Sequence, residues 1–172
     1  MLQNAEAYAK PEDIKQYIGE AYFFRAYSYF DLLQLYGDVI ITKKPLDITD
    51  PEMKVKRNDR SEVVDLIIDD LNHAVENLPA FKELTTEEEG RISKEGAQAF
   101  LSRVALYEGT WQKSRNGNQN TQRSANLLDI AAKAARTVID AKYGYTFRLF
   151  GTDSETKILG DSAQKYMFQF GK

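Results

Sequence analysis

The segment GEAYFFRAYSYFDLLQLYGD, Gly19 to Asp38, carries aromatic and aliphatic side chains around a few small residues and ends at a glycine. At helical spacing its apolar residues form two stripes instead of one. A helix that is apolar on two sides must be covered on two sides, so we expect it to lie between other helices and away from the surface. Gly37 stands where a residue of positive φ ends a helix, and a short apolar run follows Asp38.

Towards the N-terminus this helix is expected to begin at Pro11. Proline is favoured at the first helical position, and Glu12 and Asp13 place negative charge beside the positive end of the helix dipole. The predicted helix therefore covers residues 11–36. At about 1.5 Å per residue it is roughly 40 Å long, so we expect it to form the spine of a helical bundle.

Three further segments repeat apolar residues at intervals of three and four and are predicted as helices over about 61–78, 93–109 and 124–142. Ser61, Ser93 and Ser124 are the expected N-caps, and Gly109 is the expected end of the third helix. Successive helices pair into hairpins with a period near the roughly 34 residues of a tetratricopeptide unit, allowing for inserted loops. We predict one all-α, mainly helical domain over residues 1–172, built from tetratricopeptide-like stacked helix hairpins.

The C-terminal part, residues 143–172, is predicted to be extended. Tyr166, Phe168 and Phe170 alternate with other residues, which is typical of a strand, yet no partner strand follows in the sequence. An unpaired aromatic edge strand invites aggregation, so we expect the parent chain to continue beyond Lys172.

Composition excludes several classes of function. A net charge of −3 and a pI near 5.3 argue against a nucleic-acid-binding protein. Without cysteine there is neither a disulfide nor a thiolate metal site, and the only histidine, His73, has no second histidine with which to share zinc. The carboxylates of Glu62, Asp65 and Asp69 follow one helix face, which supplies too few converging oxygens for a hard cation. We expect neither metal nor cofactor.

The residue types of an active site are missing as well. The sequence has no cysteine nucleophile, no G-x-S-x-G elbow and no phosphate-binding loop, and its acidic residues lie on helix faces and in loops. We therefore expect no catalytic residue and no enzymatic activity.

Two places are candidates for ligand contacts. The connection after Gly37 is long and mixes both charges, and long connections are often functional; Lys44, Asp47 and Asn58 are its candidate residues. A solvated loop of alternating charge is the alternative. Trp111 precedes a polar segment, Gln112 to Arg123, which we expect to be an exposed loop; its indole is either a lid on a helix pair or a flat face that stacks on a sugar ring.

The run GEAYFFRAYSYFDLLQLYGDVIITKKP resembles the signature helix of the SusD/RagB family, the outer-membrane nutrient-binding lipoproteins of Bacteroidetes-type bacteria. Three further stretches match that family in order, and together the four cover most of the chain. They are SEVVDLIIDDLNHAVENLP, GRISKEGAQAFLSRVALYEG and LLDIAAKAARTVIDAKYGY.

This resemblance implies a receptor on the extracellular face of the outer membrane that captures an oligosaccharide or other nutrient and passes it to a SusC-like TonB-dependent transporter. Family members are anchored through a lipidated N-terminal cysteine, which does not occur in this sequence, and much of their glycan site lies C-terminal to the part matched here. Six residues match the family pattern and are expected to be structural: Arg25, Gly37, Asp38, Gly90, Arg91 and Tyr107.

A second function stays open. Tetratricopeptide-like modules also bind peptides or partner proteins in a helical groove, with no sugar involved. Such a scaffold normally repeats its polar groove residues from unit to unit, and the two hairpins predicted here share no such set.

Overall fold

The computed structural model describes residues 10–115 and 121–147. Within these ranges the chain is helical and contains no strand, only an isolated antiparallel bridge between Val39 and Asn58. The predicted all-α class is therefore confirmed. The α-helices are α2 (Pro11–Tyr36), α3 (Arg60–Asn77), α4 (Lys94–Arg115) and α5 (Thr121–Ile139), and the short 3-10 turns are η1 (Pro51–Lys54), η2 (Phe81–Glu83) and η3 (Thr86–Glu88).

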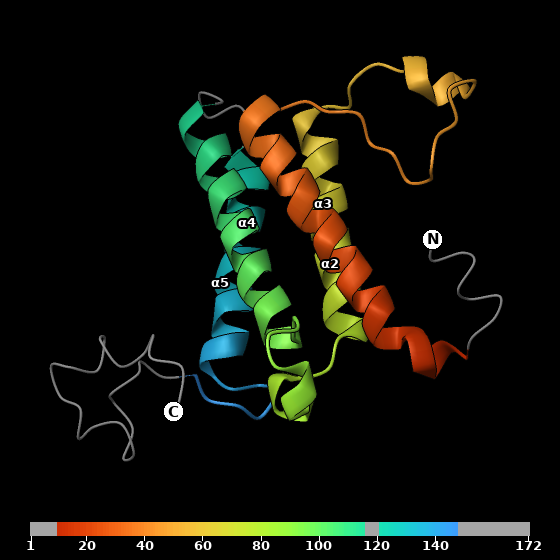
Figure 1. Ribbon diagram of the computed structural model, residues 1–172. Coiled ribbons are helices and arrows are strands. Elements are labelled where there is room, and N and C mark those ends of the chain that lie inside the picture. Colours follow the sequence, from red (N-terminus) through yellow and green to blue (C-terminus); the bar gives the residue numbers. More distant parts are fainter. Residues whose placement is uncertain (1–9, 116–120, 148–172) are drawn as a thin grey trace, which may run out of the picture.

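The helices form two hairpins that lie side by side. α2 packs against α3, and α4 packs against α5, with each pair running antiparallel (Figure 1). α3 also contacts α4, which joins the two hairpins. This is the stacked, tetratricopeptide-like arrangement that the repeat spacing predicted.

The core lies between α2, α3 and α4. Phe23, Ala26, Phe30 and Leu33 of α2 follow one another at intervals of three and four, so they share the face that is buried against the other helices. The Phe100 ring of α4 lies 5.5 Å from the rings of both Phe23 and Phe30. Since burying one large apolar side chain is worth about 1.5–3 kcal/mol, this cluster is a main source of cohesion between the hairpins.

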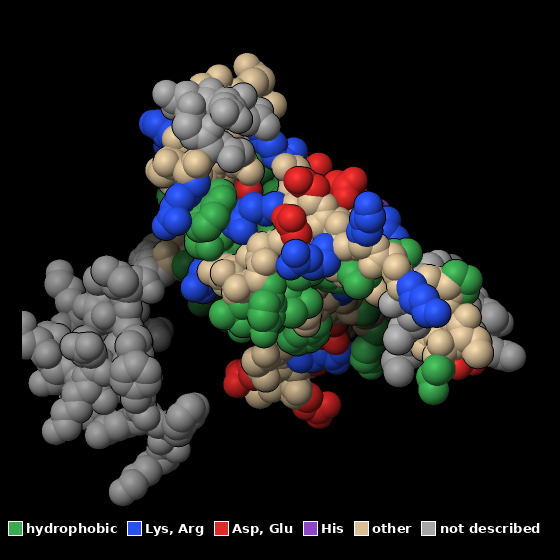
Figure 2. Space-filling model, turned by 90° about the horizontal axis from the view of Figure 1, so that it is seen from above, with side chains coloured by type: hydrophobic (Ala, Val, Ile, Leu, Met, Phe, Trp, Pro, Cys, Tyr) green, Lys and Arg blue, Asp and Glu red, His purple; other side chains and the backbone are tan. Residues whose placement is uncertain are grey.

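The expectation that α2 is covered on two sides is wrong for the described residues. Tyr17 and Phe24 are each 58% exposed and Leu35 is 74% exposed, on the side of α2 that α3 and α4 leave uncovered. The space-filling view shows hydrophobic side chains gathered on the surface just below its centre (Figure 2). This side of α2 is therefore largely open within the described residues, although the Arg91 guanidinium carbon lies 4.9 Å from the centre of the Tyr17 ring.

The start of α3 also differs from the prediction. Asp59, not Ser61, is the N-cap, because its side-chain oxygen accepts a hydrogen bond from the Ser61 amide at 2.8 Å. At the start of α4, Ser93 is the cap as predicted: its hydroxyl oxygen accepts from the Gly96 amide at 3.3 Å.

α4 runs to Arg115, past Gly109, where the sequence predicted its end. Gly109 is buried in the middle of the helix, and a Cβ there would lie 3.0 Å from the side chain of Leu128. The glycine thus permits close approach of α5 and does not end α4. The predicted polar loop is accordingly shorter: Gln112 is helical and buried, and α5 begins at Thr121, so Ser124 does not cap it.

Beyond α5 the chain folds back on the connection between α3 and α4. The rings of Tyr145 and Phe147 lie 4.6 Å and 5.4 Å from the ring of Phe81. Most of the segment predicted to be extended, residues 143–172, lies outside the described residues. The alternating aromatic residues Tyr166, Phe168 and Phe170 lie outside the described residues.

Candidate functional site

The connection between α2 and α3 is pinned at its base. Asn58 donates its backbone amide to the Val39 carbonyl at 2.9 Å, accepts from the Ile41 amide through Oδ1 at 2.9 Å, and donates through Nδ2 to Glu62 at 3.0 Å. From α2, the Tyr29 hydroxyl accepts from the Thr42 amide at 2.7 Å. The two ends of the connection are therefore held together beside the start of α3.

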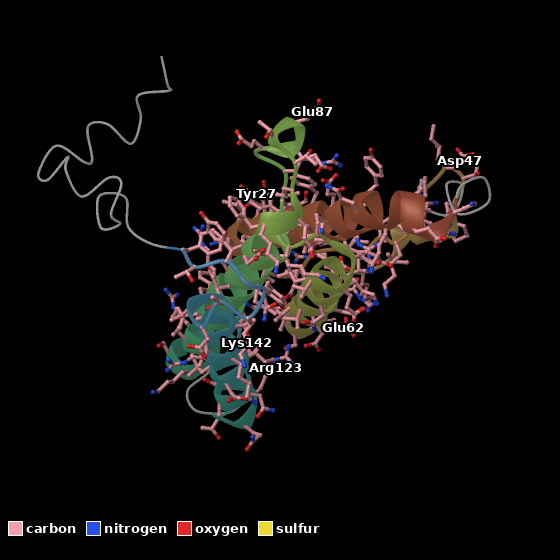
Figure 3. All side chains as sticks on the ribbon, turned by 90° about the horizontal axis from the view of Figure 1, so that it is seen from below. Tyr27, Asp47, Glu62, Glu87, Arg123 and Lys142 are labelled. Atoms are coloured by element: carbon pink, nitrogen blue, oxygen red, sulfur yellow. The ribbon has the colours of Figure 1, made fainter. Side chains whose placement is uncertain are left out.

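The other two candidates in this connection lie further out. Lys44 forms an ion pair with Asp50 at 3.1 Å, and the Asp47 carboxylate accepts from the Ile48 amide at 2.6 Å. Asp47 lies at the end of the molecule remote from Arg123 of α5 (Figure 3). Asn58 is thus anchored within the fold, whereas Asp47 is exposed on a projecting loop.

Trp111 lies on α4, not in a loop. The guanidinium carbons of Arg60 and Arg115 lie 4.2 Å and 4.7 Å from the centre of its ring, and Tyr107 stacks against it at 6.3 Å. Cation–π contacts of this kind hold an indole in place. A sugar that stacked on this ring would have to compete with those guanidinium groups, so the geometry favours the lid interpretation.

Two of the residues expected to be structural are arginines in ion pairs between distant elements. Arg25 of α2 donates to both carboxylate oxygens of the fully buried Asp70 at 2.7 Å and 2.6 Å, and this hydrogen bonding raises the pKa of the Arg25 guanidinium. Arg91 donates in the same two-pronged way to Glu20 at 2.7 Å and 2.8 Å. Such bidentate pairs fix both distance and orientation. They connect α2 to α3 and to the start of the second hairpin.

The other four residues that were expected to be structural lie at turns or in the core. Gly37 has φ of 73°, and its amide donates to the Leu33 carbonyl at 3.0 Å, which closes α2. Asp38 accepts from the Arg60 amide at 3.0 Å, Gly90 has φ of 92°, and the Tyr107 ring packs edge-on against Phe30.

One buried ion pair was missed by the sequence analysis. Glu108 of α4 is fully buried and accepts from Arg60 Nε and from Gln112 Nε2, at 2.9 Å and 2.7 Å. The signal was present: Glu108 follows Leu101 and Val104 in the apolar stripe of its helix. An acidic residue in that position requires a positively charged partner when it is buried.

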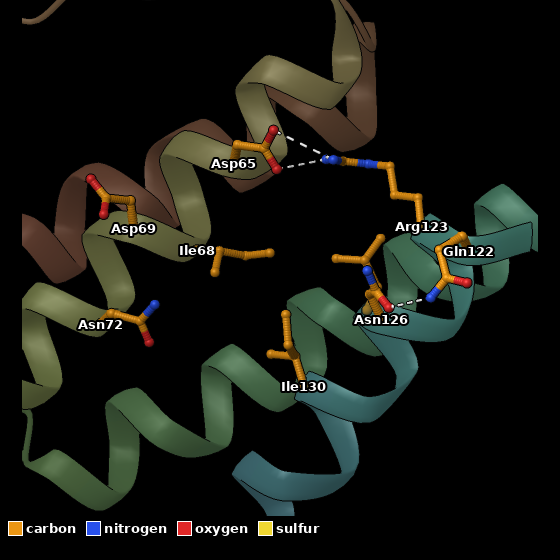
Figure 4. A pocket seen from close by; sticks show the side chains of 9 residues that line it. Asp65, Ile68, Asp69, Asn72, Gln122, Arg123, Asn126 and Ile130 are labelled. Atoms are coloured by element: carbon orange, nitrogen blue, oxygen red, sulfur yellow. Dashed lines mark hydrogen bonds and ion pairs between the residues drawn. The ribbon is translucent and has the colours of Figure 1, made fainter. Parts of the chain in front are cut away.

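An open groove lies between α3 and α5, with a volume of about 640 Å³. Its walls carry carboxylate and amide side chains, and its floor is formed by Ile68, Leu127 and Ile130 (Figure 4). Arg123 of α5 bridges the walls at one end, donating to Asp65 at 2.7 Å. The polar lining residues are Asp65, Asp69, Asn72, Gln122, Arg123 and Asn126.

A second hollow of about 610 Å³ lies between α3 and the α2–α3 connection. The two hollows share Asp65 and Asp69, and the second also contacts Asn58, Glu62 and Lys43. The sequence-predicted candidate Asn58 therefore lines a hollow next to the groove, with Asp65 and Asp69 between the two. Trp111 does not line either hollow.

Two further features concern the part of the chain that the structure describes. No group of three or more His, Cys, Asp or Glu side chains is placed there to hold a metal ion. In the same residues, no helix has both the length and the apolar character needed to cross a membrane.

Comparison with known proteins gives a consistent family. Residues 1–106 match the SusD-like family model described as starch-binding and associating with the outer membrane. SusD-like protein P38 of Formosa agariphila is 37% identical over 93 residues, which is 54% of this chain and 17% of that protein.

Two solved structures share the fold. A laminarin-binding SusD-like protein matches with a TM-score of 0.62 and 27% identity, over 82% of this chain and 27% of that one. A crystal structure with xylogluco-oligosaccharide matches with a TM-score of 0.61 and 29% identity, over 78% of this chain and 25% of that one. The chain thus spans about a quarter or less of the length of these relatives.

Proposed function

The chain belongs to the SusD-like family, and from this we propose that it is the helical portion of a cell-surface receptor that captures oligosaccharide without chemically altering it. The observation that carries this proposal is the family match together with a relative named for laminarin binding and another solved with xylogluco-oligosaccharide. Proteins of this family associate with the outer membrane. We place this receptor on the extracellular face.

Sugar recognition in this part of the receptor is assigned to the connection between α2 and α3. Lys44, Asp47 and Asn58 offer charged and amide groups that exchange hydrogen bonds with hydroxyls, the chemistry that neutral glycans require. Asn58 is held by Val39 and Ile41, which keeps its surroundings in one geometry before the ligand arrives. Trp111 is the aromatic candidate, and its contacts with two arginines support a structural role instead.

Delivery of the captured glycan to a SusC-like TonB-dependent transporter is the second half of the proposal. It follows from family membership alone. Co-purification of the transporter with the tagged receptor from outer membranes tests it, because a receptor that acts independently leaves the transporter behind.

Calorimetric titration tests glycan capture directly. The chain is titrated with laminari-oligosaccharide and with xylogluco-oligosaccharide, the two neutral glycans to which the relatives point. Saturable heats with one or both support the proposal, and the absence of binding to any neutral glycan contradicts the assignment of sugar contacts to this part of the receptor.

A protein-binding scaffold without sugar binding is the alternative function. The exposed Tyr17, Phe24 and Leu35 on α2 favour it, because contiguous apolar side chains at a surface are typical of protein contacts. Titration separates the two: a scaffold gives no heat with any glycan.

A further inference from the structure

We propose that the groove between α3 and α5 is a further contact site for a neutral oligosaccharide, separate from the α2–α3 connection and from Trp111. The inference rests on the proposed function, from which it takes the class of ligand. The inference adds the site at which the oligosaccharide binds and the requirement that the oligosaccharide be uncharged.

The groove offers hydrogen-bonding groups that the described residues leave unused. Asn72 extends into it from α3, and its amide forms no hydrogen bond with the described part of the chain (Figure 4). On the opposite wall Gln122 donates to Asn126 at 2.8 Å, which engages one atom of each amide and leaves the Gln122 oxygen and the Asn126 amino group available. Amides present a donor and an acceptor side by side, which suits neighbouring sugar hydroxyls.

The floor is apolar, and this too fits a sugar. Ile68 of α3 and Ile130 of α5 face each other across the groove, with the buried Leu127 between the helices. Binding sites for small molecules usually combine such a floor with a few placed polar groups, in volumes of about 300–1,000 Å³. The C–H faces of a pyranose can rest on these side chains while its hydroxyls reach the walls.

Charge selects a neutral ligand. Asp65 is paired with Arg123, so it adds no net charge, and Asp69 remains as an additional carboxylate. In the neighbouring hollow Glu62 and Lys43 balance each other, so the two hollows together have an excess of one carboxylate, that of Asp69. This excess of negative charge repels uronic acids and sulfated sugars, whereas uncharged chains meet no such barrier.

The groove is also held in shape without a ligand. Arg123 donates to the Ser61 carbonyl at 3.0 Å as well as to Asp65, so α5 is fastened to the first turns of α3. A preformed groove spares the ligand the cost of ordering it. Asp65 and Asp69 line both hollows, so these two carboxylates border the groove on the side that faces the α2–α3 connection.

The test removes one amide from each wall, that of Asn72 and that of Asn126, with the double variant N72A/N126A. Both side chains are exposed, so the thermal midpoint should stay that of the unsubstituted chain. The matched control is E76A/K133A, which alters one exposed residue on each of the same helices, leaves the net charge unchanged and lies outside both hollows.

Calorimetry with laminari-oligosaccharide and xylogluco-oligosaccharide should show binding to N72A/N126A weakened by about 10- to 30-fold, as expected for two lost hydrogen bonds, and binding to the control unchanged within about twofold. An oligosaccharide of uronic acids should bind the unsubstituted chain more weakly than the neutral glycans. Unchanged affinity in N72A/N126A overturns the groove proposal alone. Equal or tighter binding of the uronic acid chain overturns the charge argument. Failure of the unsubstituted chain to bind any neutral glycan overturns the groove together with the proposed sugar contacts of the α2–α3 connection.

Discussion

Arg60 Nε lies 2.9 Å from Glu108 Oε2, so the first residue of α3 neutralises a fully buried carboxylate on α4. The same guanidinium donates through Nη1 to the Leu33 carbonyl in the last turn of α2, at 3.3 Å. It also covers the ring of Trp111. One side chain therefore connects the C-terminal end of α2, the start of α3 and the middle of the second hairpin.

Replacing Arg60 with alanine should be strongly destabilising. Glu108 would remain buried with only Gln112 as a hydrogen-bond donor, and removing one partner of a buried ion pair typically costs about 3–5 kcal/mol. Urea denaturation of R60A gives the loss in free energy of unfolding. Arg115→Ala is the control, because Arg115 is exposed and also lies over Trp111, a contact worth about 1 kcal/mol or less at a surface. Equal effects of the two variants would show that the Glu108 pair is not the main contribution.

Periodicity alone identified the four α-helices of the described residues, because the residues that a helix buries recur at intervals of three and four. Their ends were harder to predict. Glycine is a residue type that often ends a helix, yet Gly109 lies within α4 and permits close packing against Leu128. Before α3, Asp59 and Ser61 are both residue types that favour the N-cap position. The sequence alone does not show that Asp59 is the N-cap.

Ion pairs between residues far apart in the sequence could not be predicted, for a different reason. The ion pair of Arg25 with Asp70 joins residues 45 apart, and that of Arg91 with Glu20 joins residues 71 apart. A pattern of spacing tells which face a residue occupies but not what lies opposite. The groove could not be predicted for the same reason. The polar face of α3 was predicted, but its position opposite Gln122 and Asn126 depends on how the two hairpins pack.

Gly19 is a second site of close helix packing. A Cβ at this position would lie 2.9 Å from the Leu78 backbone nitrogen, which cannot move aside without shifting the end of α3. Gly19→Ala should therefore lower the free energy of unfolding by about 1–3 kcal/mol, despite the better helix propensity of alanine. Thermal or urea unfolding measures the change.

Gly96→Ala is the control for this variant, because the one close approach of a Cβ there is to the end of the flexible Ile92 side chain, and the Ser93 hydroxyl lies at an ordinary contact distance of 3.8 Å. It should be neutral or stabilising by up to about 1 kcal/mol. If G19A were as stable as G96A, α2 and α3 would be less tightly packed than the structure has them.

Trp111→Phe separates the two roles considered for the tryptophan. A smaller ring loses part of the contact with Arg60 and Tyr107, so we expect a loss of about 1–2 kcal/mol in stability. Glycan affinity should stay within about twofold of the original value, since the ring does not line the groove. Chemical denaturation and calorimetry on the same preparation give both quantities. A large loss of affinity with unchanged stability would instead assign Trp111 to the sugar site.

Acidification should destabilise the connection between α3 and α4 through Glu88. Its carboxylate accepts from the backbone amide and the hydroxyl of Thr85, each at 3.1 Å, and these bonds lower the pKa of Glu88 in the folded state. A lowered pKa means that the unfolded chain takes up the proton first, so this contribution is complete above the unfolded pKa of about 4.3 and is lost as the pH falls through the folded value.

Melting temperatures between pH 7 and pH 3 test this expectation. The unsubstituted chain should lose more of its melting temperature on acidification than Glu88→Gln, which keeps the size of the side chain but has no proton to gain. Glu87→Gln, at the exposed neighbouring position, is the control and should follow the unsubstituted chain. Because the contacts of Glu88 are at the surface, salt should reduce the difference between the two curves. Parallel curves for Glu88→Gln and the unsubstituted chain at low salt would show that the Thr85 contacts do not favour the charged carboxylate.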